Sequence, residues 1–316
     1  MNLGQAKKQY LEYLEIEKNR SHKTVENYDR YLSRFVGFVG ERLGKQFDKV
    51  NTKQIDQELV RQYRLYLNRF PNAASTTSDG LKKVTQNYYI IALRGFLKYM
   101  AKIGEPCLTS EQVELGRAPA HEIDIIGYDD LERLLASVKG DSIAHLRDRA
   151  ILETLFSTGL RVSELCQLNR NSINLSRGEF SVKGKGDKIR LVFLSDNSRE
   201  ILKKYLDKRG DIEEALFVSF SKAKNPKVIG RITPRSVQRL VQYYSAKAGI
   251  TRNVTPHTLR HLFATDLLQN GADLRSVQML LGHSNVSTTQ IYTHITNKEL
   301  REIHQAFHGR RRNGAK

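Results

Sequence analysis

Residues 255–292, TPHTLRHLFATDLLQNGADLRSVQMLLGHSNVSTTQIY, contain two helix signals in succession. Thr255 followed by Pro256 predicts a helix start, because threonine caps helix N-termini and a proline at the first helical position loses no hydrogen bond. Gly271 predicts the end of that helix, since glycine readily adopts the left-handed conformation found after helix C-termini. A second, shorter helix is expected over residues 273–281, ending at Gly282.

The polar side chains of this stretch gather at the predicted helix ends. His257 and Arg260 are three residues apart on the first turn, so they share one face of the helix. His283 follows the second helix, and Tyr292 comes nine residues later. Two imidazoles, a guanidinium and a phenol beside helix ends favour a site for an oxyanion, with a phosphodiester as the natural candidate. The opposite, apolar face of the first helix is expected to carry Leu259, Leu262, Phe263, Leu267 and Leu268.

Each of these residues also has an ordinary interpretation. A helical histidine is usually solvated or packed in the core, and an arginine on a first turn usually lies on the surface. His257 and His261 have the i, i+4 spacing of a metal-binding pair. No glutamate follows the first histidine and no third ligand stands out, so metal binding is the weaker interpretation and we expect no metal site.

The composition favours a globular protein of two domains with a polyanionic partner. The chain has 316 residues, enough for two cores, and 39% of them are hydrophobic. Its formal net charge is +18, and the phosphate backbone of nucleic acid is the natural partner for such a charge. A basic protein without that partner is compatible with the charge taken alone.

The cysteine content and the lack of long apolar runs indicate a cytoplasmic protein. Two cysteines, Cys107 and Cys166, make a disulfide framework or a structural zinc site unexpected. No apolar run approaches the roughly 18 residues that a membrane-spanning helix needs. The first residues also lack the apolar core of a signal peptide.

Four amphipathic helices are predicted within residues 1–103. The second is expected to start at Ser21 or Thr24. The third is expected to be capped by Thr52, and the fourth to follow a polar loop over residues 71–80. Aromatic residues at helical spacing are more simply explained as core than as base-stacking residues. The predicted core positions are Tyr10, Leu11, Leu14, Ile16, Val25, Tyr28, Tyr31, Leu32, Phe35, Phe38, Ile55, Leu59, Tyr63, Leu67, Phe70, Val84, Tyr88, Ile91, Leu93, Phe96 and Leu97.

Regular spacing is lost over residues 104–124. Glycines and prolines punctuate this stretch, which has few large apolar side chains. We expect an interdomain linker there, with a short helix around residues 110–115 as a possible element within it.

The second half of the chain begins with further helix signals. Asp129 and Glu132 form a capping-box pattern at the start of a predicted helix. Another helix is expected over residues 142–157, and it ends before Gly159, where a glycine permits a sharp reversal of the chain. Further helices are expected over residues 195–208, from Thr233 to Gly249, and after a capping box of Thr296 and Glu299.

Residues 179–194 are the clearest predicted β segment. Phe180 and Val182 alternate with other residues before the turn. The tip at residues 184–187 contains two glycines, which permit a tight hairpin turn. After the tip, the positions expected to alternate are Ile189, Leu191 and Phe193.

The motifs of the second half occur in a characteristic order. TGLRVSEL at residues 158–165 and GKGDK at residues 184–188 precede the H-x-x-R, L-G-H and tyrosine motifs of residues 255–292. Together they resemble those of the tyrosine recombinase (phage integrase) family, most closely its Xer-type members. TGLRVSEL is similar to the first arginine box of that family, and GKGDK is similar to its lysine hairpin. The resemblance spans nearly the whole chain, and the joint occurrence of these motifs is highly specific.

The resemblance implies a mainly α-helical protein of two domains. Residues 1–103 would form an N-terminal four-helix, SAM-like core-binding domain that clamps DNA, and residues 104–124 a linker. Residues 125–316 would form a mixed α/β, mostly helical catalytic domain with a small β-hairpin sheet and a C-terminal exchange helix.

The resemblance also assigns roles to residues. Arg161 and Arg260 would bind the scissile phosphate with His283, while Tyr292 attacks it. His257 would accept the tyrosine proton, and Lys185 would protonate the leaving oxygen. Glu164 would help to orient the surroundings of Arg161. The residues proposed to contact DNA elsewhere are Lys23, Arg30, Lys82, Lys83, Arg94, Arg231, Arg235 and Arg239.

The implied activity is cleavage and rejoining of DNA through a 3′-phosphotyrosyl intermediate, without a metal or ATP and with no cofactor. The implied partners are double-stranded DNA with inverted arm sites and a homotetramer, or a heterotetramer with a second recombinase, on two duplexes. C-terminal helices would be exchanged between protomers, and a motor protein could activate the complex. The biological task would be dimer resolution of chromosomes or plasmids, or integration and excision of a mobile element, in the nucleoid of the cytoplasm.

Two other functions fit parts of the same pattern. A type IB topoisomerase would use a related site as a monomer to relax supercoils. A catalytically silent regulator would use the same fold to bind DNA. The Xer-like motifs and the full set of active-site residue types favour the recombinase.

Overall fold

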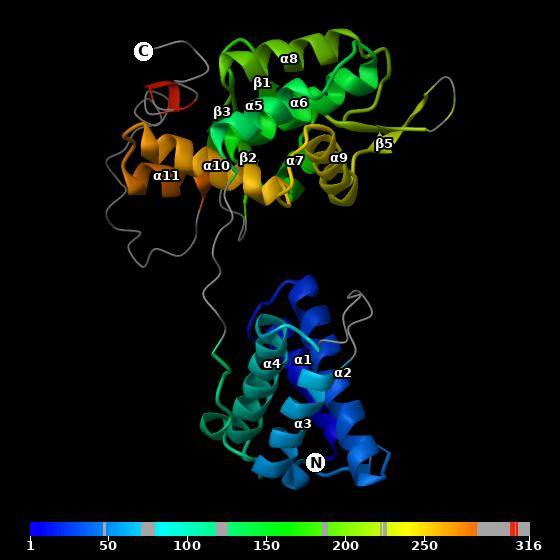
Figure 1. Cartoon of the computed structure of the whole chain (residues 1–316). Coiled ribbons are helices and arrows are strands. Elements are labelled where there is room, and N and C mark those ends of the chain that lie inside the picture. Colours follow the sequence, from blue (N-terminus) through cyan, green and yellow to red (C-terminus); the bar gives the residue numbers. More distant parts are fainter. Residues whose placement is uncertain are drawn as a thin grey trace. The chain divides into compact units, whose positions relative to one another are not determined.

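The computed structural model describes residues 1–46, 49–70, 80–117, 126–184, 189–221, 223, 226–282, 304–306 and 308. The chain divides into two compact units, Met1–Glu122 and Ile123–Lys316 (Figure 1). Within the described parts of both units, no helix is long and apolar enough to cross a membrane.

The described residues of the first unit form four α-helices around one core, which confirms the predicted helical fold of this half (Figure 1). Phe35, Tyr63 and Phe96 are fully buried at its centre, and the rings of Phe35 and Tyr63 meet edge to face at 5.0 Å. Edge-to-face contact is a favourable geometry for aromatic pairs. The helices are α1 (Leu3–Ile16), α2 (His22–Leu43), α3 (Gln57–Arg69) and α4 (Lys83–Lys102).

The third helix starts later than predicted. Thr52 begins a separate 3-10 turn, Thr52–Gln54, and α3 is capped by Asp56, whose carboxylate accepts from the Leu59 N–H at 2.7 Å. Asp56 was overlooked because Thr52 is an equally good capping residue in isolation. In the folded chain Thr52 is fully buried.

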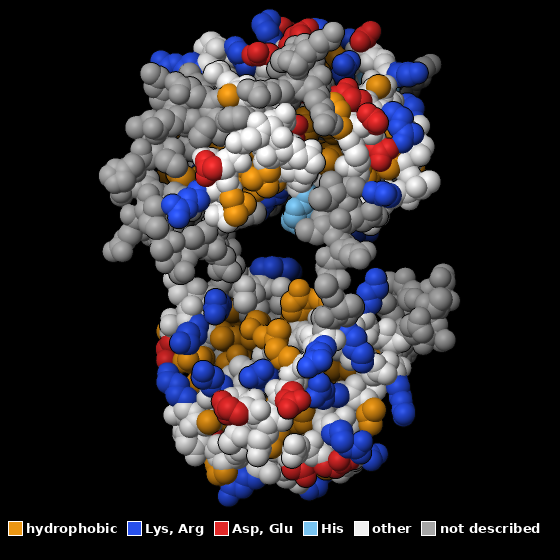
Figure 2. Space-filling model, turned by 60° about the vertical axis from the view of Figure 1, so that its left-hand side comes forward, with side chains coloured by type: hydrophobic (Ala, Val, Ile, Leu, Met, Phe, Trp, Pro, Cys, Tyr) orange, Lys and Arg blue, Asp and Glu red, His pale blue; other side chains and the backbone are white. Residues whose placement is uncertain are grey.

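The orientation of α4 also differs from the prediction. Val84, Tyr88 and Ile91 are exposed, whereas Tyr89 and Ile90 are buried. The run of adjacent apolar residues in this helix fits two orientations equally well, and packing selects one of them. Figure 2 shows hydrophobic side chains gathered among lysine and arginine side chains on one face of this unit. Ile16, at the end of α1, was likewise predicted to be in the core and is exposed.

Part of the stretch predicted to be a linker packs against the first unit. Val113 is buried in the core of that unit, and Ser110–Gln112 forms a 3-10 turn in place of a longer helix. Asn87 of α4 donates to the Gly116 carbonyl at 2.8 Å and accepts from the Gly116 N–H at 3.0 Å. These contacts hold the chain up to Gly116 against the first unit.

The second unit is mostly helical, with two small antiparallel sheets (Figure 1). Its central helix, α6, packs against α8 and α10, and the main core lies around it. The helices are α5 (Tyr128–Ala136), α6 (Ile143–Thr158), α7 (Val162–Gln167), α8 (Asp196–Asp207), α9 (Pro234–Lys247), α10 (Pro256–Gln269) and α11 (Leu274–Leu281). The strands are β1 (Ile173–Asn174), β2 (Glu179–Lys183) and β3 (Ile189–Phe193) in one sheet, and β4 (Val218–Phe220) and β5 (Val228–Arg231) in the other.

Several predicted helix ends are confirmed in this unit. The side chains of Ser142, Thr233 and Thr255 cap α6, α9 and α10. Gly159 and Gly282 end α6 and α11 with φ of 59° and 64°, in the left-handed region that favours glycine. These helix ends could be predicted because capping depends on one or two residues and the local backbone.

Three predictions of local detail are wrong in the second unit. The capping box at Asp129 does not form, because α5 starts at Tyr128 and its N-cap is Gly127. Leu268 is exposed, since it lies at the margin of the apolar face of α10. Ile189 is exposed as well, although it was expected to alternate inward.

Strand β3 does not show simple alternation at its end. Val192 and Phe193 are both buried, Val192 in the main core and Phe193 in a second cluster with Phe263 of α10. A strand covered on both faces carries consecutive apolar residues, and this explains why alternation was a poor guide here.

Candidate active site

The first part of the site is the turn between α6 and α7. Arg161 is the N-cap of α7, and Glu164 reaches back to it as predicted. The Glu164 carboxylate accepts from the Arg161 backbone N–H at 2.8 Å and from Arg161 Nη1 at 2.9 Å. Gly159 permits this turn, and a Cβ there would lie 2.5 Å from Phe263 Cδ1 and 2.9 Å from Leu281 Cδ2. The turn therefore brings α7 close to α10 and α11.

Arg260 of α10 is buried and crosses to that turn. Its Nη1 donates to the Gly159 carbonyl at 2.5 Å, and its Nη2 donates to the Leu281 carbonyl at 2.6 Å. Burial, followed by the charges of Arg161 and Arg190, lowers the pKa of Arg260 to about 10. The guanidinium is still protonated at neutral pH, so its charge is held in a place where a counter-anion would be stabilised.

Arg190 of β3 completes the group. Its Nη1 and Nη2 donate to Glu164 Oε1 and Oε2 at 2.9 and 2.8 Å, a two-pronged arrangement. Burial alone would raise the pKa of Glu164, but the hydrogen bonds and charges of Arg190 and Arg161 outweigh it and lower that pKa to about 2. Glu164 is therefore ionised at any ordinary pH.

The three arginines converge on the C-terminal end of α11. Its last carbonyls, at residues 280, 281 and 282, accept in turn from Arg190 Nε at 3.1 Å, Arg260 Nη2 at 2.6 Å and Arg161 Nη2 at 3.4 Å. A helix C-terminus attracts cations because its last carbonyls lack partners within the helix. Three segments that are distant in sequence are thus joined immediately before residue 283.

The charge balance of this group favours an anion. Three guanidiniums surround one carboxylate, so the group keeps a net charge of about +2. Guanidiniums match the oxygens of a phosphate group in both charge and geometry. The arrangement can therefore hold a phosphodiester and stabilise additional negative charge on it.

His257 lies on the exposed surface of α10 and pairs with His261. Their Nε2 atoms are 3.0 Å apart and their rings meet edge to face, with centroids at 4.3 Å. Burial first, and then the neighbouring His257 and Arg260, lower the pKa of His261, which is therefore neutral at physiological pH. Among the described residues, no group of three histidine, cysteine or acidic side chains could hold a metal ion around this pair.

The structure thus brings Arg161, Glu164 and Arg260 together, while the other candidates are placed less directly. His257 is on the first turn of the helix that carries Arg260. Lys185, His283 and Tyr292, as well as the capping box at residues 296–299, lie outside the described residues. Their roles stay predictions.

Two residues of this region were missed by the sequence analysis. Arg190 was passed over because a single cation within a β-strand has no motif of its own, and its partner Glu164 is 26 residues away. The signal that could have found it is a charged residue between the apolar positions of a predicted strand. His261 was considered only as a metal ligand.

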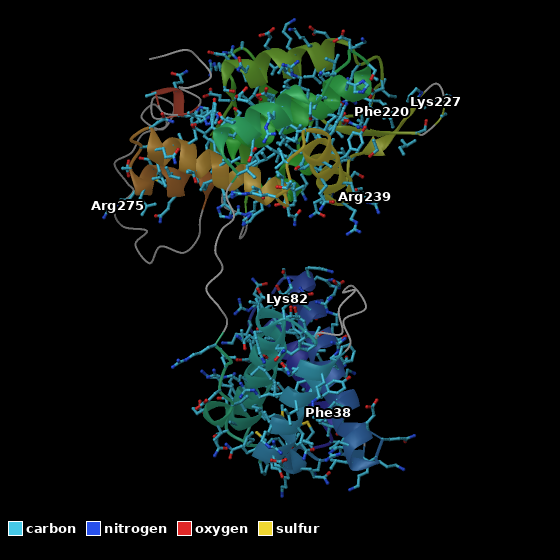
Figure 3. All side chains as sticks on the ribbon, in the orientation of Figure 1. Phe38, Lys82, Phe220, Lys227, Arg239 and Arg275 are labelled. Atoms are coloured by element: carbon cyan, nitrogen blue, oxygen red, sulfur yellow. The ribbon has the colours of Figure 1, made fainter. Side chains whose placement is uncertain are left out.

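The proposed DNA-contact residues of the first unit lie mainly on its surface. Lys23 and Arg30 are exposed on α2, and Lys82 and Lys83 are exposed at the start of α4, where Figure 3 labels Lys82. Arg94 of α4 is half-buried. Exposed cations at a helix start are suited to phosphate contacts, so these residues remain candidates.

The candidates of the second unit differ from one another. Arg235 and Arg239 are exposed on α9, where Figure 3 labels Arg239. Arg231 donates from Nη1 to the Cys166 and Leu168 carbonyls, both at 2.9 Å. These bonds give Arg231 a role within the unit and make it the weaker candidate for a phosphate contact.

We expect Glu164→Ala to destabilise the protein by about 3–5 kcal/mol, because it leaves Arg190 buried without its counter-charge. Urea denaturation should show this loss, whereas Glu200→Ala, which breaks the exposed pair with Lys204, should change the free energy of unfolding far less.

The loss in Glu164→Ala should depend on pH in a defined direction. The pKa of Glu164 is lowered, so its carboxylate stabilises the fold fully above the ordinary value near 4.5. That contribution is lost as the pH falls towards about 2. The difference in the free energy of unfolding between wild type and Glu164→Ala should thus be constant above about pH 5 and shrink below it. A difference under about 1 kcal/mol at neutral pH would contradict the role assigned to the ion pair.

Comparison with known proteins gives a consistent assignment. The model of the phage integrase family matches residues 125–299, and the model of the phage integrase N-terminal SAM-like domain matches residues 8–104. The chain is 36% identical over 303 residues to the tyrosine recombinase XerC of Pelobacter propionicus, covering 95% of this chain and 94% of that protein. It is 33% identical to the tyrosine recombinase XerD of Oceanobacillus iheyensis, covering 95% and 97%.

A solved structure agrees in fold. The site-specific recombinase XerH, bound to a palindromic difH substrate in a post-cleavage complex, superposes with a TM-score of 0.62 at 26% identity and covers 94% of this chain and 83% of that one. The predicted fold class and the predicted kind of enzyme are confirmed by these matches. The chain belongs to the phage integrase family and is a DNA-binding, Xer-like tyrosine recombinase.

Proposed function

We propose that this recombinase cleaves and rejoins DNA at specific sites through a 3′-phosphotyrosyl intermediate on Tyr292, without a metal or ATP. The observation that carries this proposal is the meeting of Arg161 and Arg260 at the end of α11, directly before His283. The two fixed cations support the proposal because the sequence continues from this helix end with His283, a further phosphate donor, and nine residues later with the phenol of Tyr292.

Each residue has a chemical task in this proposal. Arg161 and Arg260 bind the non-bridging oxygens of the scissile phosphate, and His283 donates a further hydrogen bond. Such preorganised donors typically supply several kcal/mol of transition-state stabilisation. A phenol has a pKa of about 10, so Tyr292 needs a base as it attacks, and His257 accepts that proton.

The departing group also needs a proton. Tyr292 forms a bond to phosphorus while the bond to the 5′ oxygen breaks, and Lys185 protonates that oxygen as it leaves. The phosphotyrosine retains the energy of the broken bond, so a 5′ hydroxyl from a second duplex can reverse the reaction without ATP. Strand exchange follows when that hydroxyl comes from the partner site.

The proposed assembly follows from this chemistry. Exchange between two duplexes with inverted arm sites requires four protomers, either four copies of this chain or pairs with a second recombinase, linked by their C-terminal helices. For a chain similar to XerC and XerD, the task that we propose is dimer resolution in the cytoplasm, with a motor protein activating the complex. Integration or excision of a mobile element is the alternative task.

Covalent trapping tests the proposal. The protein is mixed with a library of nicked duplexes, in which a short strand diffuses away after cleavage and prevents rejoining. A denaturing gel then reveals protein–DNA adducts, and sequencing their DNA identifies the site. After trypsin digestion, we expect the nucleotide on the peptide of residues 276–298, in which Tyr292 is the only tyrosine.

The other outcomes are also informative. Salt-sensitive binding to DNA without any adduct would contradict cleavage by this chain alone, and would favour a silent regulator or a recombinase that is inactive without its partner. Relaxation of a supercoiled plasmid without strand exchange would favour a topoisomerase.

A further inference from the structure

Arg190 occupies a position in β3 where an aliphatic residue would be expected. It pairs across the sheet with Val182, which is buried in the main core, and only 10% of the Arg190 side chain is exposed. A buried cation is costly unless it is paired and hydrogen-bonded. The contacts of Arg190 therefore indicate its role.

The Glu164 carboxylate is shared between two arginines. Oε1 accepts from Nη1 of Arg161 and Nη1 of Arg190, both at 2.9 Å. Oε2 accepts from the Arg161 backbone N–H and from Arg190 Nη2, both at 2.8 Å. Half of these four bonds would disappear without Arg190, and the two that remain would both come from Arg161.

The two arginines differ in what remains accessible. The side chain of Arg161 is 36% exposed, whereas those of Arg190 and Glu164 are 10% and 6% exposed. Arg161 can therefore reach a phosphate, while Arg190 is enclosed with the carboxylate. An Arg161–Glu164 pair by itself is neutral, and Arg190 restores the positive charge that attracts the phosphate.

Arg190 also fixes the end of α11. Its Nε donates to the Leu280 carbonyl at 3.1 Å. Gly282 lies directly against it, since a Cβ at this glycine would be 2.9 Å from Arg190 Cδ. One side chain of β3 thus contacts both the first arginine box and the helix end that precedes residue 283.

We propose that Arg190 is a positioning residue of the recombination reaction: it balances the charge of Glu164, so that the guanidinium of Arg161 stays available to the scissile phosphate, and it anchors the end of α11. This inference rests on the proposed function. Arg190 itself does not touch the DNA.

Single-turnover adduct formation on a saturating nicked duplex tests this role in Arg190→Gln, Glu164→Gln and the double variant. We expect Arg190→Gln to slow cleavage about 100-fold with nearly unchanged DNA affinity, as when one preorganised donor is lost. Adding Glu164→Gln should recover at least about tenfold of that rate, because no unpaired carboxylate then competes for Arg161. A double variant as slow as Arg190→Gln, or slower, would overturn the proposal.

Arg190→Lys is a second test variant, which keeps the positive charge. It should therefore destabilise the fold less than Arg190→Gln does. We expect its rate to stay within about tenfold of the wild type. A rate as low as that of Arg190→Gln would overturn the charge-balancing role. Thermal melting of each variant separates loss of fold from loss of rate.

Sulfate distinguishes a failure of this inference from a failure of the proposed function. If the wild type forms no adduct, the proposed function fails, yet the charge balance is still measurable without cleavage. Sulfate should then raise the Tm of the wild type. The rise should be smaller for Arg190→Gln, and for the double variant it should be larger than for Arg190→Gln. Equal sulfate shifts in all three would overturn the inference.

Discussion

Tyr292→Phe is expected to abolish covalent adduct formation on nicked duplexes while leaving DNA affinity unchanged. The substitution removes one oxygen, which is the proposed nucleophile, and keeps the ring. Phenylalanine carries no group that can form this bond, so the rate should fall by at least about 10⁴-fold. DNA binding rests on cations and backbone contacts and should not change.

Two other tyrosines of the second unit, Tyr205 and Tyr244, make poorer nucleophiles on physical grounds. Tyr244 donates its hydroxyl proton to Asp148 at 3.0 Å, and burial, followed by the charge of Asp148, raises its pKa far above the ordinary value. Tyr205 is fully buried, and burial raises its pKa too. Tyr243 is 62% exposed, so its hydroxyl is accessible. Tyr243→Phe is therefore the matched control.

The two variants should behave differently in one assay. We expect Tyr243→Phe to form adducts at the wild-type rate, with the nucleotide still on the peptide of residues 276–298. Adducts formed by Tyr292→Phe, or loss of adducts in Tyr243→Phe, would show that the nucleophile has been assigned to the wrong residue.

The features that could be predicted from the sequence are those set by short-range chemistry. A threonine before a proline caps α10, and a glycine ends α6 and α11, because each of these structures depends on the residue itself and its nearest neighbours. The reversal of the chain at Gly159, just before Arg161, could be predicted for the same reason. The motif order then identified the family.

Contacts between distant segments could not be predicted in this way. Arg190 belongs to the site because β3 folds against α7 and α11, and a charged residue between the apolar positions of a strand does not by itself say which segments it will meet. The burial of Arg260 has the same cause: its partners are carbonyls of Gly159 and Leu281, and a carbonyl carries no signal in the sequence. Only the folded backbone brings these groups together.

Arg260→Lys is expected to reduce the rate of adduct formation about 10³-fold, although the charge is nominally conserved. Arg260 uses two different nitrogens to reach two carbonyls, and its planar fork leaves further N–H groups for a phosphate. A lysine has a single nitrogen and cannot span the same partners. Loss of one such donor typically costs 10²- to 10³-fold, and the loosened end of α11 adds to that.

The comparison variant is Arg275→Lys. Arg275 is an exposed residue of α11 that Figure 3 labels. This variant makes the same chemical change near the same helix and should alter the rate less than about threefold. A rate for Arg260→Lys within about tenfold of the wild type would contradict the importance of the guanidinium geometry.

The pH dependence of Arg260→Lys provides a separate check on the cause. Burial and the neighbouring arginines lower the pKa of Arg260 to about 10 and leave it charged at neutral pH. The same burial and neighbouring charges would lower the pKa of a lysine at this position below its ordinary value. A lysine is charged below its pKa, so cleavage by the variant should fall further as the pH rises from neutral into the mildly alkaline range, whereas the wild-type site keeps its cation there. If the variant were slow to the same degree at every pH, geometry alone would account for its defect, and the charge held at Arg260 would have no separate role.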